Sequence, residues 1–329
     1  TTTVDRSYTQ QVIRANTEFQ LPPTPTFTKT FNWNRQYDLK YDLTKSIKVT
    51  YNANNQALIG EPAGRVDKEF EDEYKVFVDS VRKSLREFGE TTHFTQTVGV
   101  NYNLPLSKIP ATDWLDANLS YNGSYDWRRA PLAQDTLGHT IQNSNVRSIN
   151  GQATFSKLFT KFKVFREINA KKNKAKRERR RGGRMPARNM GNILPQDSTK
   201  TKKSKNENTL SFGEGILSLL MSPKTANFNY SVNEGMMLPG FGRRSNVIGM
   251  DPSFEAPGLG FVFGQQVEDY PQLAAERGWL VLEPELYQPY TNSYTENFKM
   301  RLNLEPVNDM RLDINWNKDL TRSNSAFFR

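Results

Sequence analysis

The sequence predicts an all-β protein, in which part of the wall of an antiparallel transmembrane β-barrel carries helical and irregular insertions between its strands. Three observations support this fold class. Long segments alternate apolar and polar residues, the apolar positions are rich in Tyr, Trp and Phe, and the mean hydropathy is only −0.73. No apolar run approaches the roughly 18 residues that a membrane-spanning helix needs, whereas barrel strands alternate and are never apolar on average.

The clearest alternation covers residues 31–51, with a turn at Lys45-Ser46. A helix would place apolar residues every three or four positions, so the period of two indicates strands. We expect the following odd positions to face lipid: Phe31, Trp33, Tyr37, Leu39 and Tyr41. We expect the following even positions to face a water-filled lumen: Asn32, Asn34, Gln36, Asp38 and Lys40.

The first strand is long for a soluble protein. The alternation from 27 to 43 covers 17 residues, which at about 3.3 Å per residue gives roughly 55 Å. A tilted transmembrane strand needs only about 9 to 11 residues, and soluble strands average about 5 or 6. We therefore expect a tall wall that projects beyond the bilayer.

Helices are expected only between strands. From 67 to 88 apolar residues fall three and four positions apart, with acidic residues early, basic residues late and Gly89 as the stop. A shorter helix is expected from Pro271 to just before Gly278.

The alternation returns over 94–104, 115–127, 149–155, 228–232, 294–304 and 310–316, which makes eight strands. A ninth, over 7–19, is compatible with the pattern. In these later strands the residues expected to face lipid are Leu119, Tyr121, Trp127, Phe298, Leu302 and Trp316. Those expected to face the lumen are Asn101 and Asn118.

The predicted organisation follows from these elements. Residues 1–26 hold the ninth strand and a Pro-rich turn, and 27–157 hold barrel strands with a helical insertion at 58–90. A basic loop at 158–223, with a short helix at 216–221, precedes a strand at 224–235, an insertion at 236–290 and a hairpin at 291–329. If the Lys45-Ser46 turn is periplasmic, strand parity places both insertions outside the cell and the basic loop in the periplasm. The absence of an initiator Met suggests a piece of a longer polypeptide.

The positive charge is concentrated in one segment. Residues 161–205 contain 17 Lys or Arg and 3 Asp or Glu. We expect a helical beginning at 161 with Phe162, Phe165 and Ile168 on one side, then disorder from about 182 to 208. The residues proposed for the basic loop are Lys171, Lys172, Lys176, Arg177, Arg179, Arg180 and Arg181. They could contact phosphates, acidic proteins or anionic headgroups, but no aromatic residues for stacking on bases are interleaved with them, and a solvated loop is the simplest interpretation.

No motif indicates catalysis. The pattern Gly258-x-Gly260-x-x-x-Gly264 has one residue too many for a dinucleotide site, and a tight loop with Phe261 and Phe263 packed inward explains it better. His93 and His139 are the only histidines, and neither has metal-ligand spacing. We expect no enzyme activity, metal or cofactor.

Several stretches, in a consistent order along the chain, together resemble the SprA/Sov family, the giant barrel that forms the translocon of the type 9 protein secretion system in Bacteroidota. The stretches are Phe31-Asn32-Trp33-Asn34-Arg35, Tyr41-Asp42-Leu43-Thr44-Lys45-Ser46, Glu61-Pro62-Ala63-Gly64, Leu238-Pro239-Gly240-Phe241, Ala256-Pro257-Gly258-Leu259-Gly260-Phe261-Val262-Phe263-Gly264, Gly278-Trp279-Leu280 and Leu304-Glu305-Pro306.

The resemblance implies a multi-pass outer-membrane protein through whose gated lumen folded, secreted cargo proteins cross. It also implies a PorV-type partner barrel, a periplasmic plug protein and contact with the lipid bilayer, with no nucleic acid as partner. On this interpretation two loops help to form an extracellular cap or gate, through Leu238, Pro239, Gly240, Phe241, Pro257, Gly258, Gly260, Phe261 and Phe263.

Two alternatives remain open. One is a soluble antiparallel β-protein held by aromatic cross-strand pairs. The other, from a different functional class, is a soluble nucleic-acid-associated β-protein that binds through residues 161–205.

Overall fold

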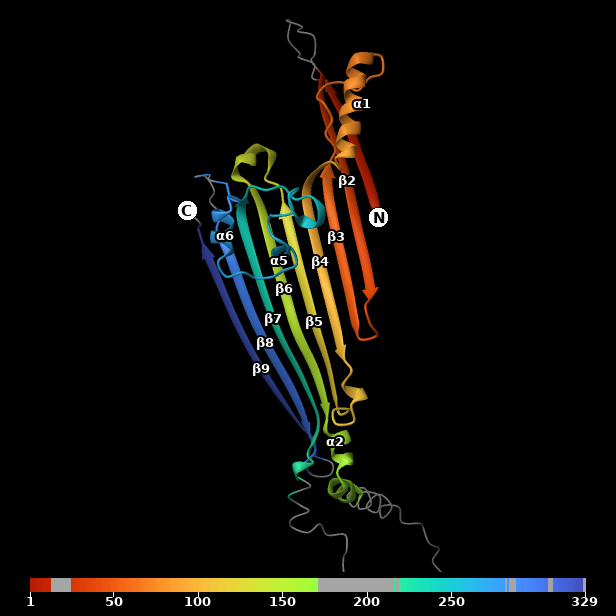
Figure 1. Ribbon diagram of the computed structural model, residues 1–329, viewed down its shortest axis with the longest axis vertical. Helices are drawn as coiled ribbons and strands as arrows, with labels where there is room; N and C mark the ends of the chain where they lie inside the picture. Colours follow the sequence, from red (N-terminus) through yellow and green to blue (C-terminus); the bar gives the residue numbers. More distant parts are fainter. Residues whose placement is uncertain are drawn as a thin grey trace, which may run out of the picture.

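The computed structural model describes residues 1–12, 25–170, 216, 219–281, 283, 288–306 and 310–327 (Figure 1). This part of the chain forms one antiparallel sheet of nine strands, in which the order across the sheet is the order along the chain. The strands are β1 (Thr2–Val12), β2 (Pro25–Asp42), β3 (Ile47–Leu58), β4 (Glu90–Leu104), β5 (Leu115–Arg128), β6 (His139–Thr154), β7 (Pro223–Phe241), β8 (Tyr290–Leu304) and β9 (Leu312–Ala326). The predicted all-β, antiparallel class is confirmed. Of the ninth strand that the pattern allows over 7–19, residues 7–12 belong to β1, which begins at Thr2, and 13–19 lie outside the described residues.

The strands are long, from 11 residues in β1 to 19 in β7. All exceed the usual length of about 5 or 6 residues in soluble sheets. β1 and β9 are the edges, and within the described residues each is paired on one side only, so the sheet is not closed. Unpaired N–H and C=O groups on edges of this length are a template for further strands.

The connections alternate between two ends of the sheet (Figure 1). The upper end carries α1 (Glu71–Arg86), η2 (Leu132–Leu137), η3 (Val247–Gly249), α5 (Leu259–Val262) and α6 (Tyr270–Glu276). The lower end carries the turn at 43–46, η1 (Leu106–Lys108) and α2 (Phe155–Lys161). This alternation agrees with the predicted strand parity. None of the helices in the described ranges is both long and apolar enough to cross a membrane.

α1 forms as predicted, although it begins at Glu71 rather than at 67. Acidic residues occupy its first turn and basic residues its last turn, which complements the helix dipole. Gly89 ends it with φ +71°, and its N–H donates to the Ser84 carbonyl at 2.8 Å. A Cβ at Gly89 would lie 2.9 Å from Ile59 Cδ1, so only glycine fits this turn.

Several strands extend beyond their predicted bounds, and β9, for example, ends at Ala326 instead of 316. β7 contains the strand predicted over 224–235 but continues to Phe241, six residues past the predicted end, so Leu238, Pro239, Gly240 and Phe241 belong to a strand rather than a loop. The pairing with β6 shifts where Pro239 and Gly240 lie, because His139 pairs with Phe241 and Ile141 with Leu238. A bulge accommodates a proline within a sheet, which explains why the sequence breaker does not end the strand.

β6 begins at His139 rather than at 149. Residues 155–161 and 163–170 are helical, so the basic segment does begin with helix, starting six residues before the predicted position. The seven basic-loop residues, from Lys171 to Arg181, lie outside the described residues, as do 13–24. Residues 216, 219 and 220 are helical, in agreement with the short helix predicted there.

Candidate pore wall

Strand register divides the sheet into two chemically different faces. Leu39 pairs with Tyr51, Tyr51 with Val98, and Val100 with Tyr121, so apolar residues of successive strands meet on one face, called here the apolar face. It carries all the residues expected to face lipid: Phe31, Trp33, Tyr37, Leu39, Tyr41, Leu119, Tyr121, Trp127, Phe298, Leu302 and Trp316. The opposite, polar face carries all those expected to face a lumen: Asn32, Asn34, Gln36, Asp38, Lys40, Asn101 and Asn118.

Hydrogen bonds between side chains cross the polar face from strand to strand. Asn118 Nδ2 donates to Asn103 Oδ1 at 2.7 Å, and the hydroxyls of Ser120 and Ser148 lie 2.6 Å apart. Further bonds join Ser124 to Ser144, Asn229 to Asn150 and Asn303 to Thr225. These pairs fix the side chains while their remaining donors and acceptors stay available to water.

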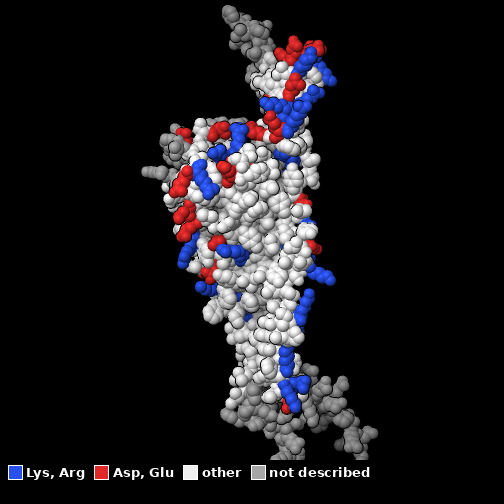
Figure 2. Space-filling model, in the orientation of Figure 1, with Lys and Arg blue, Asp and Glu red and all other residues white. Residues whose placement is uncertain are grey.

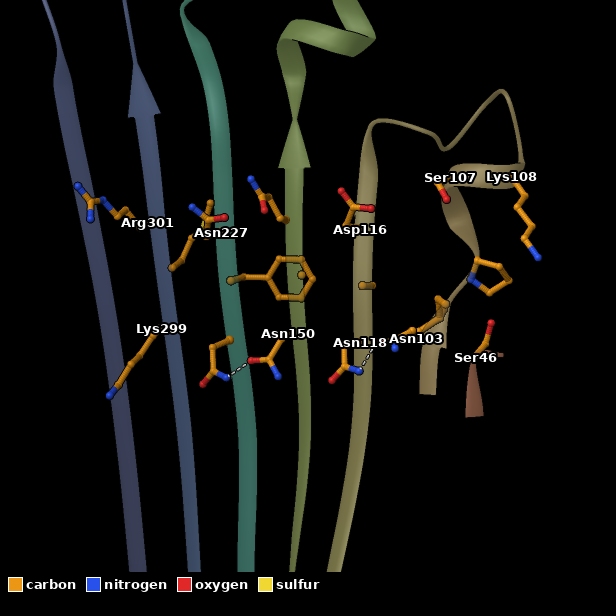
Figure 3. A pocket seen from close by; sticks show the side chains of 18 of the residues that line it. Ser46, Asn103, Ser107, Lys108, Asp116, Asn118, Asn150, Asn227, Lys299 and Arg301 are labelled. Carbon is orange, nitrogen blue, oxygen red and sulfur yellow. Dashed lines mark hydrogen bonds between the residues drawn. The ribbon is translucent and has the colours of Figure 1, made fainter. Parts of the chain in front are cut away.

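The polar face is hollowed near its lower end (Figure 3). The hollow has a volume of about 950 Å³, and most of its lining comes from polar-face residues of neighbouring strands. Its charged lining is mainly cationic: Lys45, Lys108, Lys299 and Arg301 with the single acid Asp116. Arg301 has a partner outside this lining, because its Nη2 lies 3.3 Å from Asp313 Oδ2.

The upper part of the apolar face is covered by residues 242–281 of the second insertion, called here the docked insertion. Its buried residues Phe261, Val262, Tyr270, Ala274 and Trp279 pack against the sheet. The sheet contributes Phe94, Tyr125, Trp127, Ile141, Met236 and Leu238. The rings of Phe261 and Tyr270 stack with centroids 4.2 Å apart, and burial raises the pKa of Tyr270.

Polar side chains beneath the docked insertion hold its backbone. Gln96 Nε2 donates to the Val262 carbonyl at 2.8 Å, and Asn143 Nδ2 donates to the carbonyls of Phe261 and Gln265 at 3.1 and 3.0 Å. Asn145 Nδ2 donates to the Gly264 carbonyl at 2.8 Å, and Tyr121 and Trp127 donate to those of Phe263 and Arg243. Sequence reasoning missed Gln96, Asn143 and Asn145. Their signal is a polar residue at a position where the alternation calls for an apolar one.

A close backbone contact explains the last glycine of the Gly258-x-Gly260-x-x-x-Gly264 pattern. Gly264 has φ +91°, and a Cβ there would lie 2.6 Å from the Ser144 carbonyl oxygen. A Cβ at Gly123, on the facing strand, would lie 2.1 Å from the Phe263 oxygen. These two glycines let the insertion touch the sheet directly.

Two expectations need correction. Trp127, expected to face lipid, is 1% exposed because the docked insertion covers it. Of the two rings expected to pack inward, Phe261 is buried at 2% exposure whereas Phe263 is 37% exposed. The loop with Pro257, Gly258 and Gly260, predicted as part of a cap or gate, lies against the apolar face, on the opposite side of the sheet from the hollow.

The lower part of the apolar face is exposed. Its largest exposed side chains are Tyr37, Leu39, Tyr41, Ile314 and Trp316, and they lie on strands at both sides of the sheet. In the view of Figure 2 the charged side chains gather on α1, at the upper end and along the two sides of the molecule, and the area between them carries few. The exposed apolar side chains of the lower part indicate an interaction surface.

The two histidines do not form a common site. His93 Nε2 lies 2.9 Å from Asp126 Oδ2, whereas His139 Nδ1 accepts the Ala130 N–H at 3.1 Å and its ring lies 4.7 Å from that of Trp127. Burial lowers the pKa of His139. Both contacts support the structure of the strand ends.

No protein-family model and no curated protein sequence gives a significant match to the chain.

Proposed function

We propose that this sheet is part of the wall of a large outer-membrane β-barrel that conducts folded proteins, as the translocon of a type 9 secretion system does. The observation that carries the proposal is that apolar side chains gather mainly on one face of the sheet and uncharged polar ones on the other, together with the exposed lower part of the apolar face. Hydrocarbon outside and water inside require this arrangement of side chains.

A soluble sandwich would use the apolar face differently. A second sheet would cover that face along its whole length, whereas the docked insertion covers only the upper part of the described sheet. The exposed residues include Tyr41 and Trp316, on strands at the two sides of the sheet. Aromatic residues of this kind are favoured where a barrel meets the membrane interface.

The open edges support a barrel of more strands than these nine. On the side that faces β1, residues 37–42 of β2 have no strand partner among the described residues, and neither does the outer edge of β9. Further strands would satisfy these backbone groups and close the wall. The lumen partners in this proposal are secreted cargo and a periplasmic plug protein, and a PorV-type barrel would bind outside. All three come from the family resemblance, which supports the proposal.

Placing the apolar face toward lipid also places the docked insertion outside the lumen, above the lipid-facing surface. The insertion is therefore a fixed outer collar in this proposal, not a gate. Its hydrogen bonds to three neighbouring strands would hold those strands together where they leave the membrane.

Single-cysteine labelling in intact outer membranes tests the proposal, because the chain contains no cysteine. Leu39→Cys and Trp316→Cys should resist a membrane-impermeant maleimide and react with a lipid-soluble one. Asn101→Cys and Asn118→Cys should react with the impermeant reagent once it enters the lumen. Equal labelling of Trp316→Cys and Asn118→Cys by the impermeant reagent would overturn the proposal.

Fractionation distinguishes the soluble alternatives. The proposed wall protein sediments with outer membrane and requires detergent for extraction. Recovery in the aqueous fraction would favour a soluble protein, and nucleic acid recovered with it, lost on deletion of 171–208, would identify the nucleic-acid-binding alternative.

A further inference from the structure

A groove of about 730 Å³ lies on the apolar face where its covered and exposed parts meet. β2 and β3 form its floor, and the end of α1 and the segment around η3 form its walls. Most of its surface is apolar, through Tyr37, Leu39, Tyr51, Phe88, Val247 and Ile248.

The groove is lined by two charged side chains, Arg35 and Asp38. Arg35 is 8% exposed, and its guanidinium carbon lies 4.7 Å from the Trp33 ring centroid and 5.5 Å from that of Phe88. Nη2 donates to Asn55 Oδ1 at 3.0 Å, whereas the buried Nε has no hydrogen-bond partner. Among the described residues, no carboxylate forms an ion pair with Arg35.

This arrangement is unusual for a buried arginine. Its five N–H donors and its charge are normally matched by a carboxylate, a phosphate or several carbonyls. Two aromatic rings and one amide hold the guanidinium here without neutralising it. The groove therefore favours an anion beside Arg35.

The shape of the groove indicates what the anion is attached to. Phe88 and the η3 segment line the groove near Arg35, and Leu39, four residues along β2, lines it toward the lower end. That separation is roughly 13 Å at about 3.3 Å per residue. Beyond it the exposed Tyr41 continues the apolar surface, so an apolar chain could leave the groove along the face proposed to contact lipid.

We propose that this groove binds a phosphate-bearing membrane lipid, with the phosphate on Arg35 and an acyl chain along Tyr37 and Leu39. The planar guanidinium can donate two parallel hydrogen bonds to a phosphate, which makes arginine the residue suited to this headgroup. The inference rests on the proposed function, because a lipid reaches the groove only if the apolar face contacts the bilayer.

Binding of three water-soluble probes to the purified full-length protein in nonionic detergent tests the proposal by isothermal titration calorimetry. The probes are dioctanoyl phosphatidic acid, dioctanoylglycerol and glycerol 3-phosphate. Only the first should bind measurably, because it combines phosphate and chain. If glycerol 3-phosphate bound as tightly as dioctanoyl phosphatidic acid, the site would recognise phosphate alone. If dioctanoylglycerol bound as tightly, Arg35 would play no part in binding. Either result overturns the proposal.

Variants identify the residue. Arg35→Gln should weaken phosphatidic acid binding about tenfold or more, and Arg35→Lys should restore part of it because it keeps the charge but loses the planar fork. Arg147→Gln is the matched control, since Arg147 lies on the same face and already pairs with Glu234. Unchanged binding by Arg35→Gln would contradict the proposal.

A second measurement keeps Arg35 intact, in case its replacement prevents folding. A photoreactive benzophenone on Val247→Cys should crosslink phospholipid in membranes, whereas the same label on Val76→Cys, an exposed valine of α1, should not. Failure of Val247→Cys to crosslink, with the cysteine-labelling pattern of the two faces intact, would refute the lipid site and leave the channel proposal standing. A reversed labelling pattern would remove both.

Discussion

The upper and lower parts of the apolar face follow the same alternation in sequence but have different neighbours. In the upper part the docked insertion buries Trp127 and Ile141, whereas in the lower part Tyr41 and Trp316 are exposed. The residues between the apolar positions differ accordingly. Upper strands place Gln96, Asn143 and Asn145 on this face, where each donates to an insertion carbonyl. The comparison teaches that strand period determines the face, and that polar residues at its apolar positions can bind the protein segment that covers them.

Replacing one tryptophan in each part tests the comparison with the largest expected effect. Trp127→Ala should destabilise the upper part by about 3–5 kcal/mol, because a filled core position becomes a cavity. Trp316→Ala, on the exposed part, should cost less than about 1 kcal/mol. Denaturant unfolding of the reconstituted protein, with protease cleavage of the docked insertion as a second readout, measures both. Similar losses for the two variants would mean that the lower part is also covered.

Two glycines with positive φ, one in contact with the sheet and one not, test whether close contact holds the docked insertion in place. Gly264→Ala should destabilise the docking of the insertion on the sheet by about 2–3 kcal/mol, because the alanine Cβ would clash with the backbone of Ser144 and Gly123. Gly258→Ala has a similar φ but open space around the new Cβ, so it should cost about 1 kcal/mol. Protease nicking between 242 and 281 should rise strongly for Gly264→Ala alone. Equal nicking would show that backbone strain, not the close contact, determines docking.

The smallest expected effect concerns pH. Burial beside Trp127 lowers the pKa of His139 below its usual 6.5, and charged neighbours, Asp135, Arg244, Arg129 and Glu90, modify the shift. The unfolded chain therefore binds more protons than the folded chain in this range, and stability is lost as pH falls through about 6.5 toward the lowered value. Protonation would also place a hydrogen on Nδ1, which accepts the Ala130 N–H.

Protease cleavage of the connection at 129–138 should accordingly increase as the pH falls from 7.5 to 5. His139→Gln should flatten this dependence. A pH profile that is the same in both proteins would assign the effect to other groups.

Much of the sheet could be predicted from the sequence, because one period governs each strand. The residues of β2 from Phe31 to Tyr41 lie on the faces expected from their parity, and Gly89 ends α1 as expected. The end of β7 could not be predicted, since Pro239 usually stops a strand and only the bulge opposite β6 accommodates it. The cover on the apolar face also depends on contacts between distant segments, such as Gly123 with Phe263, which leave no local pattern.

Arg35 interrupts the alternation of apolar and polar residues, and the alternation itself does not explain why. It is the one charged residue among the odd positions from 31 to 41, between Trp33 and Tyr37. Period alone marks it as an exception. Its surroundings depend on α1 and the docked insertion, which come from distant parts of the chain, so no local sequence pattern shows that Arg35 lacks a carboxylate partner.

The strictly sequential strand order has a consequence for assembly. Since every strand pairs with its immediate chain neighbours, each new hairpin can add to the growing sheet without waiting for residues far ahead in the chain. The docked insertion is the exception, because it must reach back to β4, β5 and β6 after β7 has formed. When the docked insertion binds, it would stabilise strands that were synthesised before it. Strands made early in synthesis therefore gain part of their stability only after a later segment has been made.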